Sequence, residues 1–297
     1  MRGRTDDDRP RSRPAAKKRF GQNFLEPAWA RKVVDAIAPQ PTDVFLEIGP
    51  GPGAITRPLA DAVAALVACE IDRDLAEALR AEQLPRVHLL EADFLRLPLA
   101  DLRAALHAAA PDATAIRVAG NLPYNVASPI MFRLLELCRE GLPLSDATIM
   151  LQREVADRLL ASPGTGDYGV LSVLIGHRAS ADRLLNLPPG AFRPAPKVRS
   201  SVVRLRFHPP LPPAQDEQRL AAVTNAVFSR RRKTMGNALL AYGGLTPASA
   251  AAALRLAGID PVRRPETLSI AELVAVADAI GAALAEDRGR DTSVPVL

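Results

Sequence analysis

The sequence is poor in cysteine and contains no long apolar run. Its 2 cysteines, Cys69 and Cys138, lie far apart and form no Cys-x-x-Cys pair, so we expect neither a disulfide framework nor a metal site. No segment approaches the ~18 consecutive apolar residues that a bilayer-spanning helix needs. We therefore expect a protein that makes no membrane contact.

The first 16 residues are rich in Arg, Asp and Pro and contain almost no apolar side chains. This composition predicts a disordered arm over residues 1–16. Because the arm lacks the apolar core that secretory signals require, we expect a cytoplasmic protein.

Positive charge is concentrated in two parts of the chain, although the net charge is only +5. Residues 1–19 hold 8 basic and 3 acidic side chains, and residues 121–240 hold 16 and 9, whereas residues 20–120 hold 9 and 14. This asymmetry indicates a polyanionic partner that meets the arm and the middle of the chain. A merely solvated surface is the other interpretation of the charge alone.

Short apolar runs alternate with helical patterns in the first half of the chain. The predicted strands are 44–48, 66–69, 87–90, 116–119 and 147–151. The predicted helices are 27–38, 54–64, 73–82 and 130–137. This alternation is typical of a mostly parallel sheet with helices on both faces, an α/β fold that binds ligands beyond the carboxyl ends of its strands.

A proline-rich stretch over residues 184–213 divides this pattern from a different one. It encloses one predicted strand, 201–207, and ends in a linker over residues 209–213. Four helical patterns follow, at 217–230, 234–242, 247–257 and 269–285. We therefore predict an α/β domain over residues 17–208 and a small all-α domain over residues 214–297.

Three strand ends predict a pocket for an adenosine-type ligand. Gly49, Gly51 and Gly53 follow the first strand, where glycines allow a tight turn and a close approach of ligand to backbone. Glu70 ends the second strand, where a carboxylate can accept both ribose hydroxyls, and Asp93 follows the third, where it can accept an adenine amino group. A plain turn and solvated strand ends are the alternatives for each feature taken alone.

The same loop also fits a dinucleotide fold, because Gly49 to Ala54 can be written G-x-G-x-x-A. Hydride chemistry would need a proton donor near the carbonyl, usually His, or Tyr with Lys. The 4 histidines are scattered, and none lies in a predicted loop at the sheet end. This distribution favours S-adenosyl-L-methionine over NAD without excluding NAD.

A second loop, Asn121-Leu122-Pro123-Tyr124, follows the fourth predicted strand. The amide oxygen of Asn121 and the carbonyl of Leu122 can each accept one hydrogen of an adenine amino group, which favours a more tetrahedral nitrogen. Tyr124 can stack on a flipped base and stabilise the charge that moves onto that nitrogen. Such a loop predicts catalysis mainly by positioning and electrostatics, with no general base needed before transfer, because the amine proton becomes acidic only once the nitrogen is cationic.

With these motifs the chain resembles the ribosomal RNA adenine N6-dimethyltransferases, and most closely the bacterial enzymes that dimethylate two adjacent adenosines near the 3′ end of 16S rRNA. The matching motifs, which cover almost the whole chain beyond residue 16, are residues 18–25, 47–51, 70–72, 121–125, 151–155, 192–200 and 230–234. Two features depart from the family pattern: the Arg-rich arm has no counterpart, and Pro52 and Ala54 vary the glycine loop.

The resemblance implies roles for individual residues and for the two domains. The α/β domain would be a Rossmann-like methyltransferase domain that binds S-adenosyl-L-methionine, and the helical domain would bind RNA. The residues implied in cofactor binding are Gln22, Asn23, Leu25, Gly49, Gly51, Glu70, Asp93 and Asn121. Asn121, Leu122, Pro123 and Tyr124 would be catalytic, and Phe192 would stack on the target base opposite Tyr124.

The predicted RNA contacts come from basic residues in the positively charged middle of the chain, residues 121–240. Arg230, Arg231, Arg232 and Lys233 form the densest basic run, and Arg153 and Lys197 extend it, with Arg158 and Arg199 as further candidates. A solvated helix face is the alternative for the run. Specificity would come from RNA shape and from the adenosine that can be flipped.

Three functions remain open. The resemblance favours dimethylation of 16S rRNA during small-subunit biogenesis, by a monomer. A related methyltransferase of 23S rRNA, of the macrolide-resistance type, shares the cofactor motifs and a similar catalytic loop. A ribosome-assembly factor that binds RNA and whose catalysis is incidental is the third, and the intact set of Glu70, Asp93, Asn121 and Tyr124 argues against it.

Overall fold

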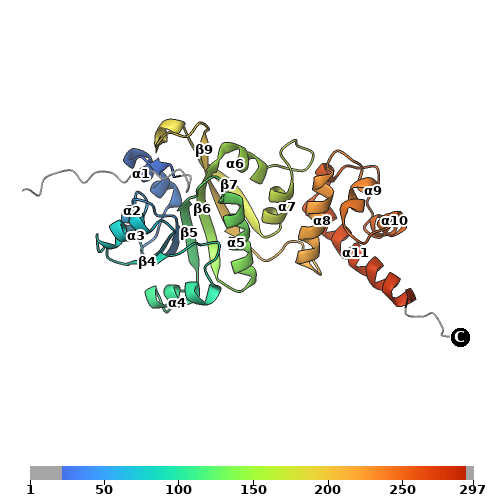
Figure 1. The fold of residues 1–297 in the computed structure, drawn as a ribbon, viewed down its shortest axis with the longest axis horizontal. Coiled ribbons are helices and arrows are strands. Elements are labelled where there is room, and N and C mark those ends of the chain that lie inside the picture. The colour runs from blue at the N-terminus through green and yellow to red at the C-terminus, as the bar shows by residue number, and fades with distance from the viewer. Residues whose placement is uncertain (1–21, 292–297) are drawn as a thin grey trace, which may run out of the picture.

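The computed structural model describes residues 22–291. The predicted arm over residues 1–16 and the first part of the motif at 18–25 lie outside the described residues. A sheet-containing region and a bundle of C-terminal helices follow one another along the long axis of the molecule (Figure 1). Within the described chain, no helix combines the length and the apolarity needed to cross a bilayer.

Seven strands form one sheet in the order β4-β3-β2-β5-β6-β9-β7. The strands are β2 (Val44–Ile48), β3 (Ala65–Glu70), β4 (Val87–Glu91), β5 (Ile116–Asn121), β6 (Leu144–Gln152), β7 (Ala179–Leu187) and β9 (Ser200–Phe207). The first five run parallel, whereas β9 pairs antiparallel with both β6 and β7. The mostly parallel sheet that the sequence predicts is confirmed, with an antiparallel edge.

The central strands bury both of their faces because their side chains alternate between two apolar cores. Leu46 and Ile48 of β2 belong to one core, and Phe45 between them belongs to the other. Helices pack on both faces: α4 (Leu99–Ala109) and α5 (Ala127–Arg139) contribute to the first core, and α1 (Pro27–Ile37) and α2 (Thr56–Ala62) contribute to the second. Of the other helices of this region, α6 (Arg153–Leu159) and α7 (Val170–Gly176) also contribute to the first core, and α3 (Arg73–Arg80) packs beside β3 and β4.

Several elements were not predicted from the sequence, and the edge strand β7 shows why. Within residues 22–291 it pairs only with β9, and polar residues such as Asp182, Arg183 and Asn186 interrupt its sequence, so no apolar run marks it. A short two-stranded sheet of β1 (Phe24–Leu25) and β8 (Phe192–Arg193) was also not predicted, because each strand has only 2 residues. This small sheet joins two motifs that lie far apart in the sequence.

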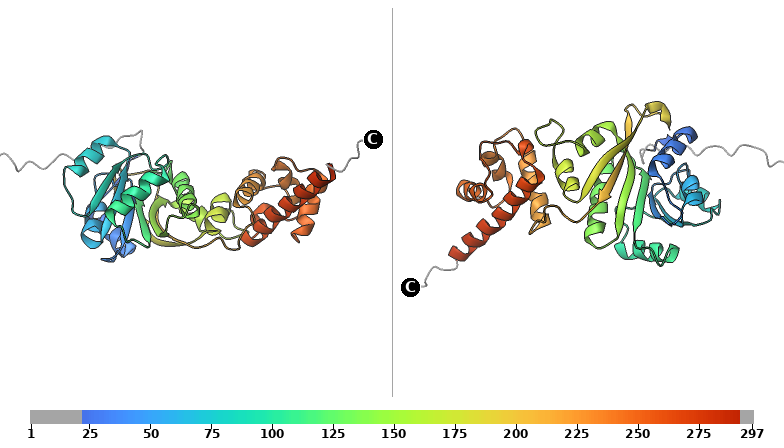
Figure 2. Two further views of the ribbon diagram at one scale, coloured as in Figure 1. Left: turned by 90° about the horizontal axis from the view of Figure 1, so that it is seen from below. Right: turned by 180° about the vertical axis from the view of Figure 1, so that it is seen from behind.

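The helical bundle is set apart from the sheet, as the two further views show (Figure 2). It comprises α8 (Glu217–Ser229), α9 (Met235–Ala238), α10 (Pro247–Leu256), α11 (Ile270–Asp291) and the short 3-10 turns Leu239–Ala241 and Pro265–Thr267. Its apolar core also takes in Tyr168 and Val173, which precede the predicted linker. The division into domains at residues 208 and 214 therefore stays a prediction.

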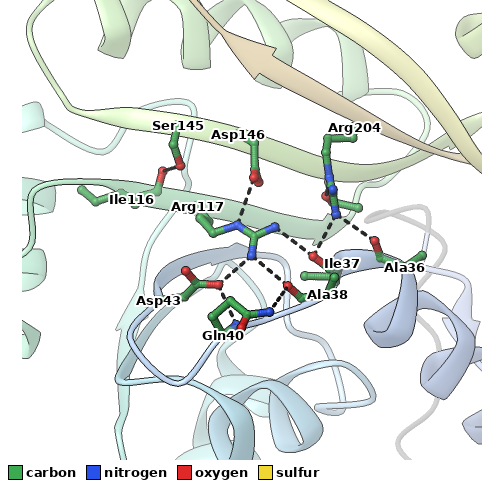
Figure 3. Close-up of polar contacts among 11 residues, drawn as sticks. Ala36, Ile37, Ala38, Gln40, Asp43, Ile116, Arg117, Ser145, Asp146 and Arg204 are labelled. Carbon is green, nitrogen blue, oxygen red and sulfur yellow. Dashed lines mark hydrogen bonds and ion pairs between the residues drawn. The ribbon is translucent and has the colours of Figure 1, made fainter.

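Two arginines fix the end of α1 to the sheet (Figure 3). Arg117 of β5 bonds to Asp43 at 2.6 Å and Asp146 at 3.0 Å, and donates to the carbonyl of Ile37 at 2.8 Å. Arg204 of β9 donates to the carbonyls of Ala36 and Ile37, both at 2.8 Å. Cations at a helix C-terminus bond its unsatisfied carbonyls and complement its dipole. The network anchors the helix that follows β1, and with it the segment that borders the candidate site.

Candidate active site

The carboxyl ends of β2, β3, β4 and β5 converge on one cavity of about 260 Å³. The residues that line it include most of those predicted for the cofactor and the catalytic loop: Gln22, Asn23, Leu25, Gly49, Gly51, Glu70, Asp93, Asn121, Leu122, Pro123 and Tyr124. This convergence follows from the parallel sheet, because strand ends that are separated in sequence meet at one edge. Phe192 is absent from the lining.

The glycine loop and Glu70 are bonded to each other. The Gly51 amide donates to one carboxylate oxygen of Glu70 at 2.9 Å, and the Asp72 amide donates to the other at 2.8 Å. Gly51 has a φ of +56°, which a side chain would strain. The two backbone bonds hold the carboxylate in one orientation at the pocket wall. Burial raises the pKa of Glu70, and these bonds oppose that rise only in part.

Asp93 lies beside Glu70 because the strands that precede them are neighbours. The Ala92 amide donates to the carbonyl of Glu70 at 2.9 Å. One oxygen of Asp93 accepts the Leu95 amide at 3.0 Å, and the other lies 3.7 Å from the exposed guanidinium of Arg96. A carboxylate oxygen has more than one lone pair, so Asp93 keeps acceptor capacity toward the cavity.

Glu47 is a site residue to which sequence reasoning gave no role. It lies within the apolar strand β2, is only 1% exposed and lines the cavity. Its Oε2 atom has no hydrogen-bond partner within residues 22–291. Burial, and to a lesser extent the neighbouring Glu70, raises the pKa of Glu47 to about 8. The available signal was its position, since an acid inside a buried strand is costly unless it has a task.

The catalytic loop leaves β5 through a tight packing point at Gly120. A side chain there would come within 2.8 Å of the carbonyl of Ile48 and 2.9 Å of the Leu122 side chain. Asn121 then donates its amide hydrogen to the carbonyl of Asn23 at 2.8 Å. Because that bond engages the amide nitrogen, it leaves the amide oxygen of Asn121 as an acceptor for a ligand.

Tyr124 and Phe192 differ in their placement. Tyr124 lines the cavity, and its hydroxyl lies 2.6 Å from the hydroxyl of Ser200. Phe192 is 2% exposed and belongs to the apolar core beside β1, with which its strand pairs. The structure therefore brings Tyr124 to the cavity and places Phe192 in the apolar core outside the lining, so stacking by Phe192 stays a prediction.

The lining distinguishes between the two cofactors that the sequence left open. Glu47, Glu70 and Asp93 line the cavity, and no Lys or Arg does so among the described residues. A pyrophosphate would meet the carboxylates of Glu70 and Asp93 and no cation here, whereas S-adenosyl-L-methionine carries a sulfonium and an ammonium group. The charge of the cavity thus fits S-adenosyl-L-methionine, with Glu70 and Asp93 available to its adenosine and the glycine loop to its methionyl arm.

Two of the predicted RNA-binding residues lie beside the catalytic loop. The Arg153 amide donates to the carbonyl of Arg199 at 2.9 Å, so the start of α6 meets the loop that carries Lys197. Arg153, Lys197 and Arg199 are all exposed. They form a basic rim next to the residue, Ser200, that contacts Tyr124.

The basic run at 230–233 lies between α8 and α9, and its members are not equivalent. Arg231 bonds to Glu266 at 3.1 Å and to the carbonyl of Gly166 at 2.8 Å, in the loop after α6. Arg230, Arg232 and Lys233 are exposed and form no side-chain ion pair within the described part of the chain. The structure thus gives Arg231 a role in packing and leaves three cations available to a ligand.

Comparison with known proteins connects this site to one family. A family model described as ribosomal RNA adenine dimethylase matches residues 13–280. The chain is 45% identical to the ribosomal RNA small subunit methyltransferase A of Aromatoleum aromaticum, across 90% of this chain and 95% of that protein. It is 43% identical to the protein of the same name in Laribacter hongkongensis, across 91% and 98%.

Solved structures agree in fold. The 23S rRNA methyltransferase ErmE is 25% identical, with a TM-score of 0.60 over 87% of this chain and 100% of that chain. A dimethyladenosine transferase from Plasmodium falciparum is 20% identical, with a TM-score of 0.68 over 85% and 95%. The predicted fold class, a Rossmann-like methyltransferase sheet followed by helices, is confirmed.

Proposed function

The chain belongs to the ribosomal RNA adenine dimethylase family, and on that premise we propose that it dimethylates N6 of two adjacent adenosines in the 3′-terminal hairpin of 16S rRNA. The observation that carries the proposal is that Asn121 and Tyr124 line the same acidic cavity as Glu70. An adenine amine and a cofactor methyl group can therefore meet in one enclosed space. We assign the small-subunit RNA as the substrate because the similar proteins are named small subunit methyltransferases.

The residues of the cavity divide into those that hold the cofactor and those that hold the base. Bound S-adenosyl-L-methionine supplies an electrophilic methyl group. Glu70 accepts the ribose hydroxyls, Asp93 accepts the adenine amino group of the cofactor, and Gly49 and Gly51 let its methionyl arm approach the backbone. Gln22, Asn23 and Leu25 form the wall that covers it.

Asn121 and Leu122 act on the target adenine. The amide oxygen of Asn121 and the carbonyl of Leu122 each accept one N6 hydrogen, which turns the nitrogen lone pair toward the methyl group. Pro123 fixes the backbone, since its carbonyl accepts the Val126 amide at 3.0 Å and closes the turn into α5. Tyr124 stacks on the flipped base and stabilises the positive charge that develops on the amine.

We propose that the RNA binds to two groups of exposed basic residues, one in each region of the molecule. The rim formed by Arg153, Lys197 and Arg199 lies at the catalytic loop, and the loop after α6 contacts Arg231. Arg230, Arg232 and Lys233 form the second group, in the helical region, which we propose as an RNA-binding domain over residues 214–297. In this proposal the protein acts in the cytoplasm, as a monomer, on the small ribosomal subunit or its precursor.

A labelling experiment tests the proposal. Isotope-labelled S-adenosyl-L-methionine is supplied with immature 30S particles and, separately, with naked 23S RNA. We expect labelled N6,N6-dimethyladenosine in 16S rRNA, identified by mass spectrometry of nuclease fragments. Label in 23S RNA alone would favour the macrolide-resistance type of activity, and binding to particles with no label in either RNA would favour an assembly factor.

A further inference from the structure

The hydroxyl of Tyr124 is held by a residue from outside the catalytic loop. Tyr124 Oη lies 2.6 Å from Ser200 Oγ, and Ser200 is 0% exposed. The Ser200 side chain makes no other hydrogen bond with residues 22–291, so the serine hydroxyl is committed to the tyrosine. Stacking needs only the aromatic ring, and the hydroxyl contact therefore requires a separate explanation.

The antiparallel edge of the sheet explains how Ser200 reaches this position. Ser200 is the first residue of β9 and pairs with Gln152, the last residue of β6, and with Leu187, the last residue of β7. Because β9 runs against the parallel strands, its first residue lies at the edge where those strands end. The catalytic loop leaves the sheet at that same edge, so the strand reversal brings a buried hydroxyl to the loop.

We propose that Ser200 is a positioning residue that fixes the Tyr124 ring for stacking on the target base. Two torsion angles set the orientation of a tyrosine ring, and a hydrogen bond at its far end restrains both. The ring is then aligned before the base arrives, so its ordering is not required in the transition state. This inference rests on the proposed function, since it assigns a role in the same methyl transfer.

The next residue provides a matched control. Ser201 is also 0% exposed and lies on the same strand, but its hydroxyl donates to the Asn186 side chain at 3.1 Å and forms no hydrogen bond with Tyr124. Adjacent residues of a strand point to opposite faces of the sheet. Replacing either serine with alanine removes one buried hydroxyl, yet only one replacement frees the tyrosine ring.

The test compares single-turnover methylation of small-subunit RNA by Ser200→Ala, Tyr124→Phe, the double variant and Ser201→Ala. We expect Ser200→Ala and Tyr124→Phe each to slow transfer by about 3- to 10-fold, the effect of one neutral hydrogen bond, and the double variant to be no slower. Ser201→Ala should transfer at the wild-type rate per folded molecule. The affinity for S-adenosyl-L-methionine, measured by calorimetry, should be the same in all of them.

A second readout does not depend on activity. The chain has 3 tyrosines, so ring signals of a tyrosine-labelled sample can be assigned by the loss of one signal in Tyr124→Phe. Ser200→Ala should shift and broaden the Tyr124 signal, and Ser201→Ala should leave it unchanged. An unmoved signal in Ser200→Ala, a wild-type rate in that variant, or rate losses that multiply in the double variant would overturn the inference. If Ser200→Ala shifts the Tyr124 signal but the wild-type protein transfers no methyl group to the RNA, the proposed function is contradicted and the restraint of the ring is not.

Discussion

The sheet region, residues 22–207, and the helical region, residues 217–291, differ in where they place their charged side chains. The sheet region buries acids at its ligand cavity, where Glu47 is 1% and Glu70 is 4% exposed. The helical region keeps its charges at the surface, either paired, as Arg263 is with Glu272, or unpaired, as in the basic run. Buried charge prepares a site for chemistry, whereas exposed charge prepares a surface for binding.

The two regions nevertheless share packing. Tyr168 and Val173 lie before the predicted linker but belong to the apolar core of the helices. The ring of Tyr168 meets that of Phe228 edge to face, with centroids 5.9 Å apart. The helical region therefore packs directly on the sheet region, which keeps the basic run in a defined place relative to the catalytic loop.

The sharpest test of the comparison is Asn121→Ala, a change confined to the sheet region. In the proposed mechanism the variant loses the amide that accepts an N6 hydrogen and directs the amine toward the methyl group, so we expect turnover to fall by about 100-fold or more. Binding of S-adenosyl-L-methionine and of RNA should remain measurable by calorimetry and filter binding. Near-normal turnover would contradict the role of Asn121.

The second test separates cofactor binding from chemistry within the sheet region. Glu70→Ala should weaken binding of S-adenosyl-L-methionine by ~1–3 kcal/mol, the cost of losing charge-assisted hydrogen bonds. Glu70→Ala also removes the hydrogen bond that the Gly51 amide donates to Glu70. Glu70→Gln is therefore the control, because its amide oxygen can still accept a hydrogen bond although the negative charge is lost. An unchanged affinity by calorimetry in both variants would exclude the ribose assignment.

The third test concerns pH and the buried acid of the sheet region. The pKa of Glu47 is raised to about 8 in the folded chain from 4.5. Its contribution to stability is therefore present below pH 4.5 and is lost as the pH rises through 8. Glu47→Gln should unfold with a free energy higher than that of the wild type by ~1–2 kcal/mol at pH 9, with no such gain at pH 4, as measured by urea denaturation. A constant difference across this range would contradict the assignment.

The fourth test moves to the helical region. Replacing Arg230, Arg232 and Lys233 together with alanine should weaken RNA binding by roughly 10-fold and lower the salt dependence of binding by about 2 to 3 in logarithmic slope, because up to three phosphate contacts are lost. Turnover at saturating RNA should not change. Arg231→Ala is the control, since its contacts with Glu266 and Gly166 predict a loss of stability and little change in slope.

The sequence predicted the buried parts of the fold well. The inner parallel strands and the C-terminal helices carry continuous apolar runs or a helical period, and these patterns reflect burial. The edge strand β4, which has no fully buried residue, still carries three apolar residues that mark it in the sequence. The edge strand β7 and the two-residue strands β1 and β8 have no such pattern, because pairing partners from distant parts of the chain create them. The same reason hid Ser200, whose role depends on the reversal of β9.

For the site, the residues at strand ends could be predicted from the sequence, but the contacts that orient their side chains could not. Glu70, Asp93 and Asn121 follow apolar runs, so their position at one sheet edge can be inferred from the sequence. That Asn23 orients Asn121 through its backbone carbonyl depends on a contact between residues 98 positions apart. Likewise, Arg231 and Arg230 are indistinguishable in the sequence, and only packing against Glu266 separates them.

The smallest expected effect completes the contrast in pH dependence. The ion pair with Arg263 lowers the pKa of Glu272 to about 2 from 4.5, so its contribution to stability is present above pH 4.5 and is lost as the pH falls toward 2. Because both side chains are about one third exposed, Glu272→Gln should cost only ~0.5 kcal/mol at pH 7 and nothing near pH 2, as measured by urea denaturation. Acid would then lower the stability of the helical region, whereas alkali lowers the stability of the sheet region. A loss of unfolding free energy in Glu272→Gln that grows toward low pH would contradict this comparison.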